Sequence, residues 1–220
     1  MIYRYMNDAH VARLRSEGTI RIRPLVAYRS TGDSRQDHTE ALITRTIPGP
    51  GRFSRDESKL IFGRDNSIEL GFGGTLRLQL HLADGYVLCF SKALDASLMT
   101  RFSCNSVMEV TDPQAFAAML SRALADIYGR VLGIHGDVSY DRSKKMEELS
   151  IADVKERGEK LRQTALADYF VKPPEYATEE EYRFVFLVDS KEPLEDLSLT
   201  VPMSRLLECC AFPCPPRPNP

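Results

Sequence analysis

The stretch YATEEEYRFVF, residues 176–186, places three consecutive glutamates against an aromatic, β-branched run that is typical of a buried strand. Residues two apart share one face of a strand, so we expect Glu179, Glu181 and Arg183 on the same side. Two carboxylates on one face repel each other, which raises the pKa of one and suits proton transfer or stabilisation of a positive charge. The alternative is a solvated strand end at which Arg183 neutralises the acids. The motif alone leaves both interpretations open.

Two other predicted strands carry polar groups that could meet these acids. The segment YRY places Arg4 on the first strand between two tyrosines, and CFSK places Ser91 at the end of a buried strand, where its hydroxyl would enter a cleft. An arginine on an early strand, a serine after a central strand and Glu-x-Glu on a late strand resemble the arginine–serine–glutamate class of ADP-ribosyltransferases. The resemblance is confined to these three short motifs.

This resemblance implies NAD as substrate, with cleavage of the nicotinamide–ribose bond by a transferase or an NAD glycohydrolase. Glu181 would stabilise the cationic ribose, as a carboxylate does in glycoside cleavage, and Glu179 would orient or deprotonate the acceptor. Arg4 would hold the pyrophosphate or a ribose hydroxyl, and Ser91 would brace Glu181 or the nicotinamide ribose. The supporting candidates are Tyr3, Tyr5 and Phe90 for stacking on nicotinamide, and Arg29, Lys172 and Arg183 for phosphate contact or support. The acceptor stays open: protein, nucleic acid, small molecule or water.

A second resemblance covers more of the chain, from Ile2 to Val188. The YRY strand, the acidic stretch Asp37–Glu40, the VLCFSK strand, Lys172 and the terminal Glu-x-Glu-x-Arg are similar to a broad, poorly characterised bacterial domain family. The chain departs from it at Tyr176, where such proteins often carry tryptophan. Asp37 and Glu40 could order their loop over a ligand. A shared fold does not assign a reaction, so this likeness leaves the chemistry open.

The charge distribution supports a second class of function. Residues 1–55 hold ten arginines and five acids, whereas residues 175–196 hold eight acids. The two segments could neutralise each other within the fold, or the basic one could bind an anion. The alternative to an enzyme is therefore a non-catalytic nucleotide- or nucleic-acid-binding module that uses Arg21 and Arg23. A toxin or phage-defence role would suit either class. A third option is a partner-binding protein that uses its proline-rich end.

The elements that must position these residues follow from periodicity and from turn signals. Asn7 is expected to begin a helix that ends at Gly18, and Asp112-Pro113 to begin another. Asp84-Gly85 predicts a tight hairpin. Ser150 is expected to open a highly charged helix. The predicted strands are Ile2–Tyr5, Ile20–Val26, Thr75–Leu82, Tyr86–Ser91 (apolar, hence central), Ser106–Thr111, Asp137–Tyr140 and Tyr182–Val188.

These elements predict one α+β domain over residues 1–200, with a mixed, mainly antiparallel sheet and intervening helices, similar in class to the ADP-ribosyltransferases. Ser30–Asp65 is expected to be a long functional loop, and residues 201–220 a proline-rich tail without helix or strand. Five cysteines and four histidines lack metal-ligand spacing, so we predict no metal. No signal region or membrane-spanning stretch is seen, so we expect a cytoplasmic protein without a membrane partner.

Overall fold

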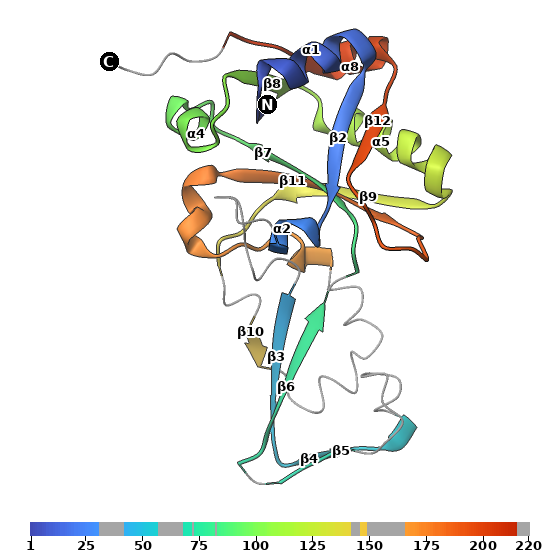
Figure 1. Ribbon diagram of the computed structural model, residues 1–220. Coiled ribbons are helices and arrows are strands. Elements are labelled where there is room, and N and C mark those ends of the chain that lie inside the picture. The colour runs from blue at the N-terminus through green and yellow to red at the C-terminus, as the bar shows by residue number, and fades with distance from the viewer. Residues whose placement is uncertain are drawn as a thin grey trace. The chain divides into compact units, whose positions relative to one another are not determined.

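The structure, a computed structural model, describes residues 1–30, 42–56, 68–71, 73–81, 83–141, 146–148 and 166–214 (Figure 1). The prediction of an α+β fold with a mainly antiparallel sheet is confirmed. Its contacts group into two compact units. The first unit comprises Met1–Glu40, Ala83–Val138 and Glu175–Pro220, and the second comprises Ala41–Leu82 and Ser139–Pro174. Among the described residues, no helix combines the length and the apolar character that crossing a bilayer requires.

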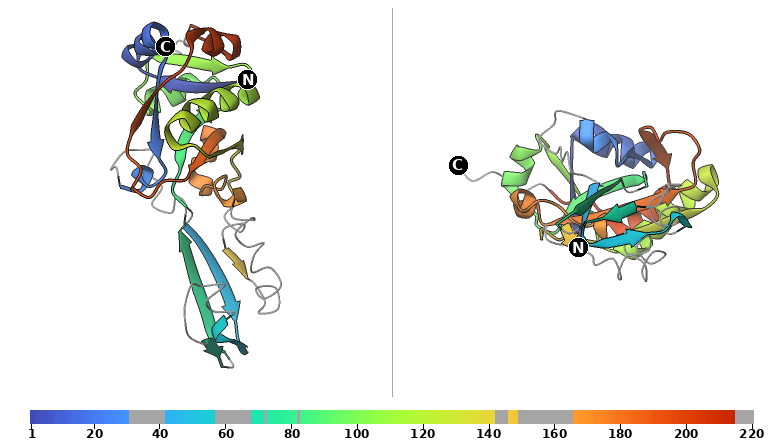
Figure 2. Two further views of the ribbon diagram at one scale, coloured as in Figure 1. Left: turned by 90° about the vertical axis from the view of Figure 1, so that its right-hand side faces the viewer. Right: turned by 90° about the horizontal axis from the view of Figure 1, so that it is seen from below.

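The first unit is built on an antiparallel sheet with β7 at its centre (Figures 1 and 2). Along one edge of β7 runs β11, which in turn pairs with β9. The almost wholly apolar sequence of β7 predicted this central place. The strands are β1 (Ile2–Met6), β2 (Thr19–Pro24), β7 (Tyr86–Ser91), β8 (Ser106–Val110), β9 (Val131–Asp137), β11 (Glu181–Val188), β12 (Leu197–Thr200) and β13 (Cys210–Ala211).

The other edge of β7 is shared by two strands. β2 pairs with its beginning, where Arg23 lies opposite Val87, and β1 pairs with its end, where Tyr3 lies opposite Ser91. Beyond these contacts β1 continues along β8, whereas β2 continues along β12. A strand has only two hydrogen-bonding edges, so two partners on one edge must diverge. We call this divergence of β1 from β2 the fork.

Local sequence signals place two of the helices as expected. Helix α1 (Asp8–Glu17) follows Asn7 and ends at Gly18, which has a left-handed φ of 64°. A Cβ at Gly18 would lie 2.3 Å from the carbonyl oxygen of Val201, so this turn requires glycine. Helix α5 (Pro113–Tyr128) begins at Asp112, whose carboxylate accepts the Ala115 N–H at 3.0 Å. The shorter helices are α2 (Ala27–Ser30), α4 (Ala96–Arg101), the 3₁₀ helix η2 (Pro174–Glu179) and α8 (Met203–Cys209).

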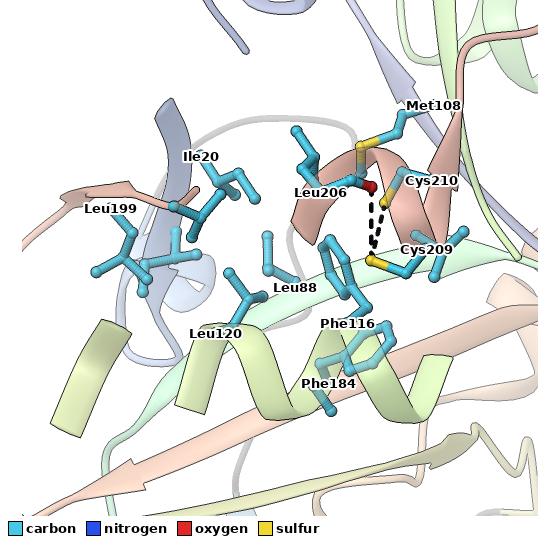
Figure 3. Packing of buried hydrophobic residues seen from close by; sticks show 14 of the residues in the cluster. Ile20, Leu88, Met108, Phe116, Leu120, Phe184, Leu199, Leu206, Cys209 and Cys210 are labelled. Atoms are coloured by element: carbon cyan, nitrogen blue, oxygen red, sulfur yellow. Dashed lines mark hydrogen bonds between the residues drawn. The ribbon is translucent and has the colours of Figure 1, made fainter. Parts of the chain in front are cut away.

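Apolar side chains cover both faces of the sheet. The main core packs α5, α1 and α8 against β2, β7, β8 and β11, and Phe116, Leu120, Phe184 and Leu206 are fully buried in it (Figure 3). A smaller cluster of Tyr5, Leu98, Met99 and Val107 packs α4 against β1 and β8. Val107 and Met108 are neighbours on β8 that join different clusters, because successive side chains point to opposite faces.

The second unit contains short sheets of its own. β3 (Leu42–Pro48) pairs antiparallel with β6 (Thr75–His81) along its whole length and parallel with β10 (Met146–Glu148), as the ribbons in Figure 2 show. β4 (Gly51–Phe53) pairs with β5 (Ile68–Leu70). The predicted loop of residues 30–65 therefore contains two strands. The prediction missed them because their pairing partners β6 and β5 lie later in the chain. The charged helix predicted from Ser150 lies outside the described residues.

Two further predictions were wrong. Asp84-Gly85 does not close a hairpin, since β6 pairs with β3 in the second unit and β7 pairs within the first. Instead the Asp84 carboxylate accepts the N–H groups of Val26 at 3.1 Å and of Gly85 at 3.0 Å.

The segment expected to be a tail from residue 201 forms α8 and β13 as far as Ala211. Leu206 and Cys209 are buried there. Their apolar side chains join the core even though the residues that follow them are rich in proline.

Candidate functional site

A pocket of about 270 Å³ opens at the fork in the first unit. It is built from the two strands that diverge, from the helix that joins them and from short segments beside them. The lining residues are Arg4, Tyr5 and Met6 of β1, Asn7, His10 and Arg13 of α1, Thr19, Arg21 and Arg23 of β2, Tyr28 of α2, Phe102, Cys104, and Ser198 of β12. Four arginines and a histidine line this pocket, which we call the arginine pocket, and none of the described residues that line it carries a carboxylate.

The sequence explains why the arginines gather there. In β2 the isoleucines at positions 20 and 22 are buried in the core, so Arg21 and Arg23 project from the opposite face. Arg4 reaches across the fork, where its Nη2 donates to the Arg21 carbonyl oxygen at 3.0 Å. Arg13 follows His10 by three residues on α1, so these two side chains are neighbours on the helix surface.

One acid just outside the pocket holds two of these arginines. Asp196 pairs with Arg21 Nη2 and, at 3.1 Å, with Arg23 Nε. Burial by itself would raise the pKa of the Asp196 carboxyl, but the hydrogen bonds from both guanidinium groups hold this pKa below its ordinary value. All three side chains keep substantial solvent exposure, between 30% and 57%. The arginines are therefore partly neutralised yet still open to a ligand.

Aromatic rings complete the arginine pocket. The Arg23 guanidinium lies over the Tyr28 ring, 5.7 Å from its centroid. Burial, followed by the nearby Cys89 thiol, raises the pKa of the Tyr28 hydroxyl, whereas Arg4 and Arg23 act to lower it and Glu181 acts to raise it. The raised pKa keeps Tyr28 uncharged at neutral pH, so Tyr28 offers the arginine pocket a neutral ring and hydroxyl.

The predicted acids are buried and paired. Glu181 is 2% exposed and its Oε1 accepts from Arg183 Nε at 2.8 Å; Arg183 is 1% exposed. Glu179 is also buried and lies 3.2 Å from Arg101 Nη2. Arg101 keeps 34% exposure, so of these two pairs only that of Glu181 and Arg183 is fully buried, and we call it the buried ion pair. A carboxylate can stay charged in the protein interior when a partner cation compensates for its lost hydration. Acids can therefore stand at the start of a buried strand.

The predicted Glu-x-Glu ladder is not a strand ladder. Glu179 ends η2, Glu180 adopts a left-handed φ of 43° and is exposed, and the strand begins only at Glu181. The two acids therefore become buried through a turn rather than through strand alternation. The error arose because the sequence signals of the strand, its aromatic and β-branched residues, start at Tyr182 and do not fix what precedes it.

The strand pairing brings only part of the predicted trio together. Ser91 lies directly opposite Glu181 on β11 and opposite Tyr3 on β1, so these three residues form one row on one face of the sheet. Arg4 follows Tyr3 in the strand, and its side chain leaves on the other face, towards the Arg21 carbonyl. Neither Ser91 nor Glu181 lines the arginine pocket.

Of the remaining predicted residues that the structure describes, Tyr5 lines the arginine pocket, and the others lie elsewhere. The Tyr5 hydroxyl donates to the Ala93 carbonyl at 2.7 Å and accepts the Asp95 N–H at 2.8 Å, and burial raises its pKa. Phe90 lies in the core against Phe116 and Phe184, with ring centroids 5.7 and 5.2 Å away, and does not line the arginine pocket.

Lys172 is buried and belongs to the second unit. The side chain of Arg29, and the whole of Asp37 and Glu40, lie outside what the structure describes. Among the described residues, no group of three or more His, Cys, Asp or Glu side chains could hold a metal ion.

No family model matches the chain, and comparisons with the curated proteins and the solved structures find no match either. The sequence singled out Arg4, Tyr5, Arg21 and Arg23 separately, but His10, Arg13 and Tyr28 were missed. His10 and Arg13 are neighbours on α1, but only the fork brings them to the same pocket as Tyr28 and the arginines of β2.

Proposed function

We propose that the first unit binds a phosphate-bearing nucleotide in the arginine pocket. The observation that carries this proposal is the composition of the pocket lining, which among the described residues has four arginines and a histidine and no carboxylate. Guanidinium groups present paired N–H donors that match phosphate oxygens, and such charge-assisted bonds are about twice as strong as neutral ones. A phosphate-bearing anion is therefore the ligand class that suits the arginine pocket best.

The rest of the lining fits the remainder of a nucleotide. Tyr28 and Phe102 offer ring surfaces for a base or a ribose, and Thr19 and Ser198 offer hydroxyl groups for sugar oxygens. The volume of about 270 Å³ is close to the lower end of ligand pockets, roughly 300–1,000 Å³. A mononucleotide, or the diphosphate part of a dinucleotide such as NAD, is of suitable size. A bounded pocket favours a small ligand over the extended backbone of a nucleic acid.

Calorimetric titration with ADP, NAD, inorganic phosphate and a single-stranded oligonucleotide tests this function. We expect ADP and NAD to bind more tightly than phosphate alone. Arg13→Gln removes one charge from the pocket and should weaken ADP binding about 10- to 100-fold, because a hydrogen bond to a charged group contributes about 1.5–3 kcal/mol. Arg122→Gln is the matched control, since Arg122 is exposed on α5 and pairs only loosely with Asp126 at 3.8 Å.

The possible results separate the two binding classes. Equal losses in Arg13→Gln and Arg122→Gln would indicate attraction by net charge alone and would contradict a specific pocket. Binding of the oligonucleotide without ADP or NAD, with an affinity that falls steeply as salt rises, would instead support the nucleic-acid-binding alternative.

The second candidate is NAD cleavage of the ADP-ribosyltransferase or NAD-glycohydrolase type. The row formed by Tyr3, Ser91 and Glu181 favours it, because a serine hydroxyl beside a glutamate is the arrangement that this class implies. In this proposal Glu181 stabilises the ribose as it becomes cationic. Since Glu181 is buried against Arg183, catalysis requires that NAD binding separate this pair and expose the carboxylate.

Release of nicotinamide from NAD tests the second candidate, with protein and nucleic-acid acceptors supplied in parallel reactions. Glu181→Gln should abolish the release, whereas Glu180→Gln, an exposed neighbour, should retain it. If the wild-type protein binds NAD and yet releases no nicotinamide with any acceptor, the chain is a binding module and the enzymatic proposal fails.

A further inference from the structure

Two adjacent cysteines lie in contact where α8 passes into β13. Their sulfur atoms are 3.8 Å apart and both side chains are buried, with Cys209 1% and Cys210 6% exposed (Figure 3). Cys209 is the last residue of the helix, and Cys210 is already extended, with φ −133° and ψ 147°. The change from helix to strand between two neighbours turns their thiols towards each other.

The two thiols differ in acidity. The hydrogen bond with Cys210 lowers the pKa of the Cys209 thiol, although burial and the carboxylates of Asp112 and Glu208 oppose this shift. The same hydrogen bond, together with burial, raises the pKa of Cys210. The thiolate is the nucleophilic form of cysteine. We assign the attacking thiolate to Cys209, whose sulfur can accept the Cys210 S–H at 3.8 Å. The Cys209 S–H must first leave the carbonyl oxygens of Arg205 and Leu206, to which it donates at 3.3 and 3.6 Å.

We propose that Cys209 and Cys210 are an oxidation site that hydrogen peroxide converts reversibly into a vicinal disulfide. The Cys209 thiolate attacks one peroxide oxygen, the O–O bond breaks, and hydroxide leaves as Cys209 becomes a sulfenic acid. The Cys210 sulfur then attacks the Cys209 sulfur, and the sulfenic oxygen leaves as water with the Cys210 proton. Two thiols and one peroxide thus give one disulfide and two waters. A dithiol reductant reverses the step by thiol–disulfide exchange.

This disulfide would act on the local fold. Neighbouring Cα atoms are about 3.8 Å apart, whereas disulfides usually join Cα atoms at least about 4.4 Å apart. The backbone between the cysteines must therefore distort. It is held at present by the Thr111 N–H, which donates to the Cys209 carbonyl at 2.8 Å, and by the pairing of Cys210 with Val110. Oxidation should loosen β13 from β8 and reduce the stability of the first unit.

Mass spectrometry after peroxide treatment tests the proposal on the full chain. The tryptic fragment that begins at Leu206 also contains the exposed Cys214, so a Cys214→Ser background gives an unambiguous assignment. We expect this fragment to lose the mass of two hydrogens, dithiothreitol to restore it, and the oxidised protein to melt at a lower temperature. With Cys210→Ser also present, the fragment should instead gain oxygen, because Cys209 has no neighbour with which to condense.

Several results would overturn the proposal. The thiols could stay unmodified at peroxide concentrations that oxidise Cys104, or the fragment could acquire only oxygen that dithiothreitol does not remove. If the disulfide formed only when urea unfolds the chain, the contact between the two thiols in the folded protein would contribute nothing to their oxidation. An oxidised protein that melts at the reduced protein's temperature would refute the coupling to β13.

Discussion

The arginine pocket and the buried ion pair of Glu181 and Arg183 use the same groups, guanidinium and carboxylate, within one unit of the protein. In the arginine pocket the guanidinium groups of Arg21 and Arg23 share a single acid, Asp196, and keep contact with solvent. In the buried ion pair of β11, Arg183 and Glu181 meet at 2.8 Å with almost no exposure.

This difference in exposure separates charged groups that can bind a ligand from charged groups that stabilise the fold. A guanidinium group that still contacts water can exchange a hydrated state for a phosphate at little cost to the fold. A buried pair is held by mutual compensation, so removal of one partner leaves the other charge in a medium that solvates it poorly. We therefore expect ligand binding to depend on the fork, and the stability of the sheet to depend on β11.

The largest expected effect is on stability, from Arg183→Met. This substitution removes the guanidinium that compensates Glu181 and should lower the free energy of unfolding by about 3–5 kcal/mol, measured by urea denaturation. The double variant Glu181→Leu/Arg183→Met should recover much of the loss, because it removes both charges. A loss below about 1 kcal/mol in the single variant would mean that Glu181 is not held by this pair, and would strengthen the catalytic proposal.

The next effect is on binding, from Arg23→Gln. ADP affinity should fall about 10- to 100-fold, whereas the free energy of unfolding should change by less than about 1 kcal/mol, as is usual for exposed ion pairs. Titration and urea denaturation of the same preparation measure both quantities. A large loss of stability without loss of binding would reverse the roles that we assign to the two regions.

Asp196→Asn should act in the opposite direction and more weakly. It releases Arg21 and Arg23 from their shared acid, so ADP should bind a few-fold more tightly, less than the tenfold that about 1.4 kcal/mol would give. Because the folded-state pKa of Asp196 is lowered, its contribution to stability is complete above its unfolded pKa of about 3.9 and is lost as the pH falls through the folded value. The stability difference between wild type and variant should therefore stay constant near neutral pH and shrink in acid. A difference that grows on acidification would contradict the assigned ion pair.

The smallest expected effect comes from Tyr28→Phe. The ring remains available to Arg23, so ADP affinity should change less than about twofold, and the free energy of unfolding by about 1 kcal/mol or less. Titration and thermal melting test both expectations. A large loss of ADP affinity would show that the Tyr28 hydroxyl, and not only its ring and the guanidinium groups, takes part in recognition.

Several elements could be predicted from sequence because their signals are local. Asn7 and Gly18 bound α1, and Asp112 caps α5, since caps depend on neighbouring backbone groups. The alternation of isoleucine and arginine in β2 fixed which side chains face the core. The pairing partners of the strands were harder to predict from sequence. Asp84-Gly85 has the sequence of a hairpin turn, but the two strands that flank it belong to different sheets.

The same distinction between local and long-range signals applies to the candidate site. Sequence alone determined that arginines alternate with apolar residues on β2 and that acids cluster where β11 begins, because both depend only on residue order. Tertiary structure decided what those charges do. The shared edge of β7 separates β1 from β2 and opens the arginine pocket, while the packing of both faces of β11 encloses Glu181 with Arg183. Exposure decides whether a charge binds a ligand or its own neighbour, and exposure is set by contacts between residues far apart in the chain.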